Sequence, residues 1–312
     1  MKILITGGAG FLGTNLIKEL VNMNKDVELT IIDNFLTGDK SNLLKLADLG
    51  IRPEVISQDI NEALAIENSF QYIFHMACPA SPEHYQAKSL QTLYTSILGT
   101  KNILEFAQKN NSRVLFTSTS EIYGDPEVNP QREDYWGNVN SFGPRSCYDE
   151  GKRAAEAMCF EFIKHFNLDI RIARIFNTYG PYMQSSDGRV VSNFINQAIK
   201  QKDITIYGDG SQTRSFCYVD DLIKGLLALM FIENNPGLPV NIGNPHEFKV
   251  IDLAQKVINL TSSSSKIVHL SLPIDDPKQR RPDISFASQF LNWAPEILLE
   301  DGLKKTIDYF KL

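Results

Sequence analysis

A glycine-rich loop close to the start of the chain constrains the fold more than any other feature. Lys2–Thr6 (KILIT) is a run of β-forming, mostly apolar residues, and the pattern G-x-x-G-x-x-G follows it from Gly7 to Gly13. Apolar residues then recur at helical spacing from Phe11 to Leu20. A tight glycine turn between a strand and a helix brings free backbone N–H groups close to a pyrophosphate. The loop therefore predicts a dinucleotide-binding unit, whereas a tight turn that binds nothing is the alternative.

Further apolar runs alternate with helical patterns along the first 180 residues. The expected strands are Val27–Ile32, Val55–Ser57, Tyr72–His75, Val114–Thr117 and Ile170–Ile175. The longest helical patterns are Leu90–Lys109 and Tyr148–His165. This alternation is typical of an α/β fold with a doubly wound parallel sheet of the Rossmann type, with helices on both faces.

Beyond residue 180 the pattern is less regular and predicts a smaller α/β lobe that binds the substrate. Helices are expected at Val191–Lys200, Leu222–Ile232, Asp252–Leu260 and Leu303–Phe310. We expect residues 1–180 to form the NAD-binding domain and residues 181–312 to form mainly the second lobe. A segment near residues 215–243 is expected to return to the first domain.

An acidic residue indicates which dinucleotide the loop would bind. Asp33 lies 20 residues after Gly13, at the end of the second expected strand, where its carboxylate can accept hydrogen bonds from ribose hydroxyls. It would repel a 2′-phosphate, and the following Asn34, Phe35 and Leu36 include no arginine to receive one. NAD is therefore expected rather than NADP. Asp59 could contact the adenine or cap a helix. The cofactor-binding candidates are Gly7, Gly10, Phe11, Leu12, Gly13, Asp33, Asn34, Thr37, Gly38, Asp59, Ile60, Ala77, Tyr148 and Lys152.

Tyr148 and Lys152 form the pattern Y-x-x-x-K at the start of an expected helix. Residues four apart share one helical face, so the lysine can reach both the tyrosine and a bound nicotinamide ribose. A phenol is a poor base at its ordinary pKa near 10. A nearby ammonium and the positive nicotinamide would favour the phenolate. The pair predicts oxidation of a substrate hydroxyl group.

Three polar residues follow the strand expected at Val114–Thr117. Thr119 and Ser120 offer hydroxyl groups, and Glu121 offers a carboxylate. Ligands bind at the carboxyl ends of parallel strands, so these residues are expected in the active site. Helix capping or turn formation is the alternative for the serine and the threonine.

Composition excludes several other classes of protein. The formal net charge is −6, and there is no long run of Lys or Arg, so a nucleic-acid partner is not expected. The four cysteines form no C-x-x-C pair, and neither they nor the five histidines show metal-ligand spacing. The first strand is expected to begin at Lys2, so no signal peptide is expected. A cytoplasmic enzyme with no membrane contact and no metal is therefore expected.

Taken together, these motifs resemble the extended short-chain dehydrogenase/reductase superfamily of nucleotide-sugar enzymes. The similarity is closest to the UDP-glucuronate decarboxylases, or UDP-xylose synthases, and covers nearly the whole chain. The stretches that carry it are His75–Pro82 with Tyr85, Ser118–Glu121, Tyr123–Pro126, Tyr135–Asn140, Arg145–Arg153, Arg174–Pro181, Asp187–Phe194, Tyr207–Gly210, Gln212–Phe216, Asp276-Pro277 and Arg280–Ile284.

The resemblance also implies roles for individual residues. Asn177, Arg189, Tyr207 and Arg214 would hold the UDP part, with the arginines pairing to the diphosphate. Arg280 would approach the sugar carboxylate and thus count among both the catalytic and the substrate-binding residues. The remaining substrate-binding candidates are Glu83, Tyr85 and Arg145.

One substitution separates the reactions within this superfamily. Related sugar dehydratases carry Thr-Asp-Glu where this chain has Thr119-Ser120-Glu121, and the serine cannot readily protonate a departing hydroxyl. The resemblance therefore implies NAD-dependent conversion of UDP-glucuronate to UDP-xylose in a homodimer packed through the Leu90–Lys109 and Tyr148–His165 helices. A nucleotide-sugar 4-epimerase is the nearest alternative, and a non-catalytic NAD sensor is a more distant one. Ser96 replaces an asparagine that is usual in the family, which puts one local hydrogen bond in doubt.

Overall fold

Seven parallel strands form the main sheet of the computed structural model, which describes residues 1–272 and 279–312. The strands lie in the order β11-β6-β5-β4-β1-β2-β3, and every neighbouring pair is parallel. Their bounds are β1 Lys2–Thr6, β2 Glu28–Ile32, β3 Glu54–Ile56, β4 Tyr72–His75, β5 Arg113–Thr119, β6 Ile170–Ile175 and β11 Val240–Ile242. The predicted doubly wound parallel sheet is confirmed.

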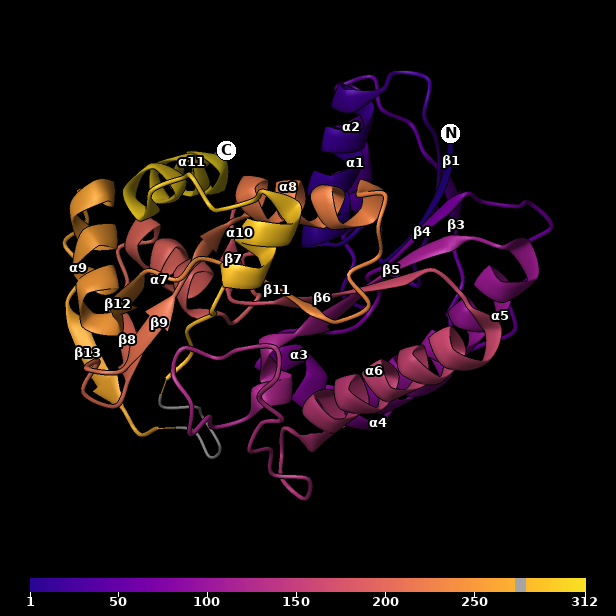
Figure 1. Cartoon of the computed structure of the whole chain (residues 1–312). Coiled ribbons are helices and arrows are strands. Elements are labelled where there is room, and N and C mark those ends of the chain that lie inside the picture. The colour runs from indigo at the N-terminus through magenta and orange to yellow at the C-terminus, as the bar shows by residue number, and fades with distance from the viewer. Residues whose placement is uncertain (273–278) are drawn as a thin grey trace.

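Helices cover both faces of this sheet (Figure 1). One face carries α1 (Phe11–Met23), α2 (Lys40–Asp48) and α8 (Val219–Phe231), and the other carries α4 (Ser89–Tyr94), α5 (Thr100–Asn110) and α6 (Ser146–Phe166). Strands buried on both sides need continuous apolar runs rather than alternating ones. In β1, for example, Ile3, Leu4 and Ile5 are all fully buried.

Several predicted elements differ from the structure in their bounds, and two of these differences bear on the site. The helix expected at Leu90–Lys109 is interrupted by a π-helical turn, η1 (Thr95–Gly99). This turn packs tightly, since a Cβ on Gly99 would lie 2.6 Å from the Cδ1 of Ile60. β5 also runs two residues further than expected, to Thr119, because Ser118 and Thr119 pair with β6. These two residues therefore belong to the strand instead of following it.

The second lobe lies beside the carboxyl ends of the central strands (Figure 1). Outside the main sheet, the described residues form three two-stranded pairings: β13 with β8, β12 with β9, and β10 with β7. The bounds of the strands are β7 Thr178–Tyr179, β8 Ile204–Tyr207, β9 Thr213–Ser215, β10 Cys217–Tyr218, β12 Glu247–Lys249 and β13 Ile267–Leu270. The remaining helices are α3 Pro82–Ala87, the 3-10 helix η2 Ser120–Tyr123, α7 Val190–Ile199, α9 Val250–Thr261, α10 Ser285–Leu291 and α11 Leu299–Lys311.

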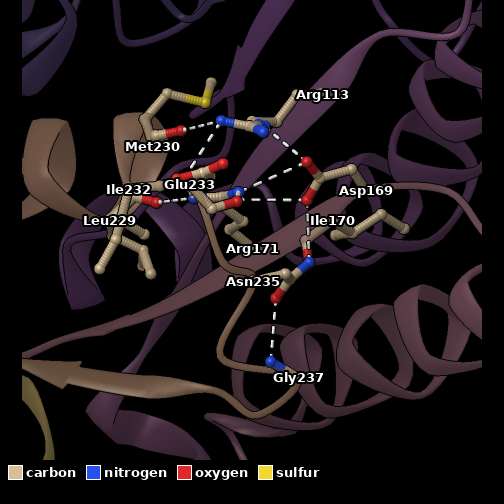
Figure 2. A network of polar contacts seen from close by, with 10 residues as sticks. All are labelled: Arg113, Asp169, Ile170, Arg171, Leu229, Met230, Ile232, Glu233, Asn235 and Gly237. Atoms are coloured by element: carbon tan, nitrogen blue, oxygen red, sulfur yellow. Dashed lines mark hydrogen bonds and ion pairs between the residues drawn. The ribbon is translucent and has the colours of Figure 1, made fainter. Parts of the chain in front are cut away.

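Two arginines of the main sheet hold the end of α8 (Figure 2). Arg171 of β6 is buried and donates to the carbonyl oxygens of Leu229 (2.8 Å) and Ile232, while Arg113 of β5 donates to that of Met230 (3.1 Å). Asp169 accepts hydrogen bonds from both guanidinium groups. The last carbonyl groups of a helix lack partners within the helix. The arginines supply those partners and so tie the end of α8 to the starts of β5 and β6.

In the part of the chain that the structure describes, no helix is long and apolar enough to cross a membrane. The same residues include no group of three or more His, Cys, Asp or Glu side chains that could hold a metal ion.

Candidate active site

The glycine loop after β1 opens a cavity at the carboxyl ends of the strands. Gly7 has a φ of +74°, and a Cβ on Gly13 would lie 2.4 Å from the carbonyl oxygen of Gly7. Both positions therefore require glycine. The cavity is lined by Gly7, Gly10, Phe11, Leu12, Gly13, Ile32, Asp33, Asn34, Leu36, Thr37, Gly38, Asn42, Gln58, Asp59, Ile60, Met76, Ala77, Cys78, Pro79, Ala80, Ser81, His84, Thr95, Tyr182, Gln184, Asp187 and Arg189. All the cofactor-binding candidates except Tyr148 and Lys152 are among them.

Asp33 lies at the end of β2 with both carboxylate oxygens engaged by the backbone. One accepts from the N–H of Ala9 (3.0 Å) and the other from the N–H of Phe35 (2.8 Å). Burial raises the pKa of Asp33, and these two hydrogen bonds act in the opposite sense. A Cβ on Gly38 would lie 2.6 Å from an Asp33 oxygen, so the loop and the carboxylate fit only with glycine there. Asp59 accepts from the Asn34 side chain (3.0 Å) and caps no helix. A dinucleotide that offers ribose hydroxyls fits this cavity.

The Y-x-x-x-K pair lies in the first two turns of α6, beside the end of β5. Lys152 donates a 2.8 Å hydrogen bond to the carbonyl oxygen of Thr117, and its ammonium lies 4.8 Å from the centre of the Phe116 ring. Burial raises the pKa of Tyr148 well above 10, and a hydrogen bond with the Thr119 side chain counteracts this in part. Burial therefore favours the protonated phenol, which is opposite to the effect that the sequence predicted for a neighbouring ammonium.

The ring of Tyr85, on α3, stacks parallel to that of Tyr148 with centroids 5.0 Å apart. The Tyr85 hydroxyl group is buried and has no hydrogen-bond partner among the described residues. Desolvation raises its pKa far above the ordinary value. Tyr85 thus packs directly against the tyrosine of the Y-x-x-x-K pair.

A cluster of charges brings η2, the start of α6 and the second lobe together. Glu121 accepts from both terminal nitrogens of Arg280, at 2.8 Å for Nη2, and from Nη2 of Arg145 at 2.6 Å. All three side chains are almost completely buried. The two guanidinium groups hold the pKa of Glu121 at about 2, against the opposing effect of burial. Arg280 is therefore occupied by a carboxylate of the protein itself.

Arg189, for which the resemblance implies a role in holding UDP, lies in the cavity of the glycine loop. Its guanidinium lines the cavity of the glycine loop, lies 5.6 Å from the centre of the Phe11 ring and is paired with Asp187. Asn177, Tyr207 and Arg214 do not line that cavity. Tyr207, at the end of β8, is 47% exposed, and Arg214 donates to the carbonyl oxygen of Thr213. Glu83 is exposed and lies against Gly188.

Several residues of the site were missed at the level of sequence. Cys78 lines the cavity, and its charge would raise the pKa of both Tyr148 and Lys152, which places its thiol beside that pair. It also contacts the hydroxyl group of Ser96 at 3.4 Å, so the serine keeps a polar contact where the family has asparagine. Asp187 lies in Asp187–Phe194, one of the stretches that carry the resemblance. The sequence therefore contained a signal that this residue belongs to the site. Asp276 and Pro277, which also carry the resemblance, lie outside the described residues.

Comparisons with known proteins agree with this geometry. The family described as "NAD dependent epimerase/dehydratase family" matches residues 3–243. UDP-glucuronic acid decarboxylase 1 of Xenopus tropicalis is 49% identical over 311 residues, which cover 99% of this chain and 72% of that protein. UDP-glucuronic acid decarboxylase 3 of Arabidopsis thaliana is 49% identical, covering 100% of this chain and 90% of that protein.

Solved structures of lower sequence identity share the fold. UDP-glucuronic acid 4-epimerase from Bacillus cereus, in complex with UDP-glucuronic acid and NAD, superposes with a TM-score of 0.88 at 29% identity, covering 100% of this chain and 99% of that chain. UDP-glucose 4-epimerase from Thermotoga maritima, with UDP-glucose, gives a TM-score of 0.90 at 27% identity, with the same coverage. The chain therefore belongs to the NAD-dependent epimerase/dehydratase family and, within it, to the UDP-glucuronic acid decarboxylases.

Proposed function

We propose that this protein converts UDP-glucuronate to UDP-xylose and carbon dioxide with no net change in bound NAD. The observation that carries the proposal is the identity of 48–50% to several UDP-glucuronic acid decarboxylases over essentially the whole chain. The structures of 4-epimerases fit the chain with 27% and 29% identity, so epimerisation is the second candidate. The Tyr148/Lys152 pair argues against a sensor that only binds NAD, since binding alone does not require it.

The cofactor would lie in the cavity of the glycine loop. The N-terminus of α1 would face its pyrophosphate and Asp33 its adenosine ribose. Arg189 is a cation in the same cavity, beside Phe11, so we assign it to the cofactor phosphates. Asn177, Tyr207 and Arg214 keep the proposed role of holding UDP. When bound, NAD would accept a hydride from carbon 4 of the sugar and later return it.

Tyr148 would take the proton of the hydroxyl group at carbon 4. Because burial raises the pKa of Tyr148, its phenolate needs a positive charge close by in order to form. Lys152, held by the Thr117 carbonyl, stays on the same face of α6. Once carbon 4 is a ketone, the carboxylate on carbon 5 is β to a carbonyl group. The carbon–carbon bond can then break to release carbon dioxide, and the electron pair enters an enolate. Carbon 5 gains a proton afterwards, and Tyr148 returns its own to the oxygen on carbon 4.

The assembly and location are part of the same proposal. Apolar side chains are exposed along α4, η1 and α6: Leu90, Tyr94, Leu98, Phe160 and Phe166. Such exposure on the elements expected at a dimer interface supports a homodimer. The four cysteines are free thiols, which supports a reducing compartment such as the cytoplasm. We also retain the division into residues 1–180, with residues 215–243 returning to that domain, and residues 181–312 as mainly the substrate lobe.

The decisive experiment is mass spectrometry of the nucleotide sugar after incubation of NAD-loaded protein with UDP-glucuronate. Loss of carbon dioxide with formation of UDP-xylose is expected. A product that keeps its carboxylate and differs only at carbon 4 would make the protein an epimerase. Failure to convert any UDP-sugar would favour a sensor.

A further inference from the structure

The cavity of the glycine loop has one wall that is distant from that loop in sequence. Tyr182, Gln184, Asp187 and Arg189 line it, and its other lining residues all lie within residues 7–95. These four belong to residues 181–189, which lie between β7 and α7 and which we call the strap. A dinucleotide in this cavity would therefore lie between the strap and the glycine loop.

Contacts at three points along the strap tie it to the elements around this cavity. At its start, the side chain of Asn15, on α1, donates to the first carbonyl oxygen of the strap (3.0 Å). In its middle, Nε2 of Gln184 donates to the carbonyl oxygen of Thr37, in the loop after β2 (2.9 Å). Near its end, a Cβ on Gly188 would lie 2.6 Å from Oε2 of Glu83, on α3. Residues of α1, of this loop and of α3 all line the cavity, so the strap spans it.

The hydrogen bond between Gln184 and Thr37 joins the two sides of the cavity directly. Both residues line the cavity, one from the strap and the other from the loop after β2. The donor and the acceptor both belong to the protein, so the bond needs no atom of the cofactor. Ser185 and Ser186, which follow in the strap, are exposed. At this point of the strap, a hydrogen bond rather than apolar packing therefore joins the two sides.

We propose that the hydrogen bond from Gln184 to Thr37 is a latch that has to open whenever NAD enters or leaves the cavity. Loss of the bond destabilises the closed protein by the same amount with and without the cofactor. Exchange then becomes faster in both directions, and the affinity stays the same. The inference rests on the proposed function, because a hydride taken from carbon 4 can return to the same sugar only if the cofactor stays in place. Gln184 is thus a positioning residue rather than a catalytic one.

The test measures exchange of the cofactor in the absence of any sugar. Protein loaded with NADH is mixed with an excess of NAD in a stopped-flow instrument, and the loss of fluorescence from bound NADH gives the dissociation rate constant. Mixing protein stripped of cofactor with NADH gives the association rate constant. In Gln184→Ala we expect both rate constants to rise by the same factor, about 2- to 10-fold, which is the typical contribution of one neutral hydrogen bond. Kd, which is their ratio, should not change.

Two further variants separate the hydrogen bond from general effects of substitution. Gln184→Glu keeps the length of the side chain and removes the N–H donor, so it should accelerate exchange as Gln184→Ala does, and it decides the matter if Gln184→Ala does not fold. Gln197→Ala is the matched control, because Gln197 on α7 donates to the hydroxyl group of Thr205 (2.9 Å) and does not line the cavity. It should leave both rate constants unchanged.

Two results would overturn the latch. One is an unchanged dissociation rate constant in both Gln184 variants. The other is faster dissociation with unchanged association, since the resulting loss of affinity would make Gln184 an ordinary contact of the cofactor. The two proposals can fail separately, because exchange is measured without sugar. Conversion of UDP-glucuronate to UDP-xylose with unaltered exchange refutes only the latch, and accelerated exchange without loss of carbon dioxide from UDP-glucuronate refutes only the decarboxylase reaction.

Discussion

Replacing Glu121 by glutamine tests the physical role of the charge cluster. The variant keeps the shape of the side chain and removes its charge, which leaves Arg145 and Arg280 buried beside an amide. Breaking a buried ion pair by removing one partner typically costs about 3–5 kcal/mol, because the other charge remains without compensation. The unfolding entropy of globular proteins is roughly 2.1 cal/mol/K per residue. For 312 residues it amounts to roughly 0.65 kcal/mol/K, so we expect Tm to fall by about 5–8 °C.

The pH dependence makes this prediction sharper. Burial and the charge of Glu121 raise the pKa of Asp149 to about 8, so removal of that charge lets Asp149 ionise more easily. An ionised Asp149 lies close enough to Arg145 to compensate part of the loss. The decrease in Tm should therefore be larger at pH 6 than at pH 9.

Differential scanning calorimetry of Glu121→Gln at a fixed scan rate, at pH 6 and pH 9, measures both effects. Glu150→Gln is the control, and its partly exposed pair with Arg153 should contribute at most about 1 kcal/mol. Circular dichroism at 25 °C should show a folded variant, while turnover of UDP-glucuronate is impaired. A change in Tm of less than 2 °C at pH 6 would refute the claim that Glu121 compensates two buried arginines.

Four other outcomes are expected. Tyr148→Phe should bind NAD normally and lose about 100- to 10,000-fold in turnover, and near-normal activity would exclude Tyr148 as the acid–base group. Calorimetric titration of protein stripped of cofactor should show tighter binding of NAD than of NADP, because Asp33 would repel a 2′-phosphate; equal affinities would contradict this. Arg171→Met should lower the urea midpoint, since the buried Leu229 carbonyl left unpaired at the end of α8 costs about 1–3 kcal/mol, and an unchanged midpoint would show that this hydrogen bond is dispensable. Burial lowers the pKa of His75 to about 3, so between pH 6.5 and pH 3 the unfolded chain binds a proton at this residue and the native chain does not. Urea unfolding should therefore show that the free energy of unfolding falls as the pH decreases from 6.5 towards 3. The decrease should be less steep in His75→Asn.

Local chemistry was sufficient to predict the fold class and the placement of Tyr148 and Lys152 on one helix. The glycine spacing from Gly7 to Gly13 specifies a strand, a tight turn and a helix within one short segment. The i, i+4 spacing of Tyr148 and Lys152 puts them on one face of a helix whatever the rest of the chain does. Both inferences depend on neighbours in sequence, so a single chain was enough to make them.

The properties of the charge cluster depended on contacts distant in sequence. Arg280 lies 159 positions after Glu121, and no spacing rule indicates that the two side chains form an ion pair. The π-helical turn at Thr95–Gly99 is likewise set by packing against Ile60 and α6 rather than by helix propensity. A pKa depends on burial and on charges brought close by folding, so the raised pKa values of Asp149 and Tyr148 could not be predicted from residue type. The sequence by itself determined which groups are available for the reaction, and only the tertiary structure decided which charges they carry, because desolvation and long-range contacts arise when the sheet, α6 and the second lobe pack together.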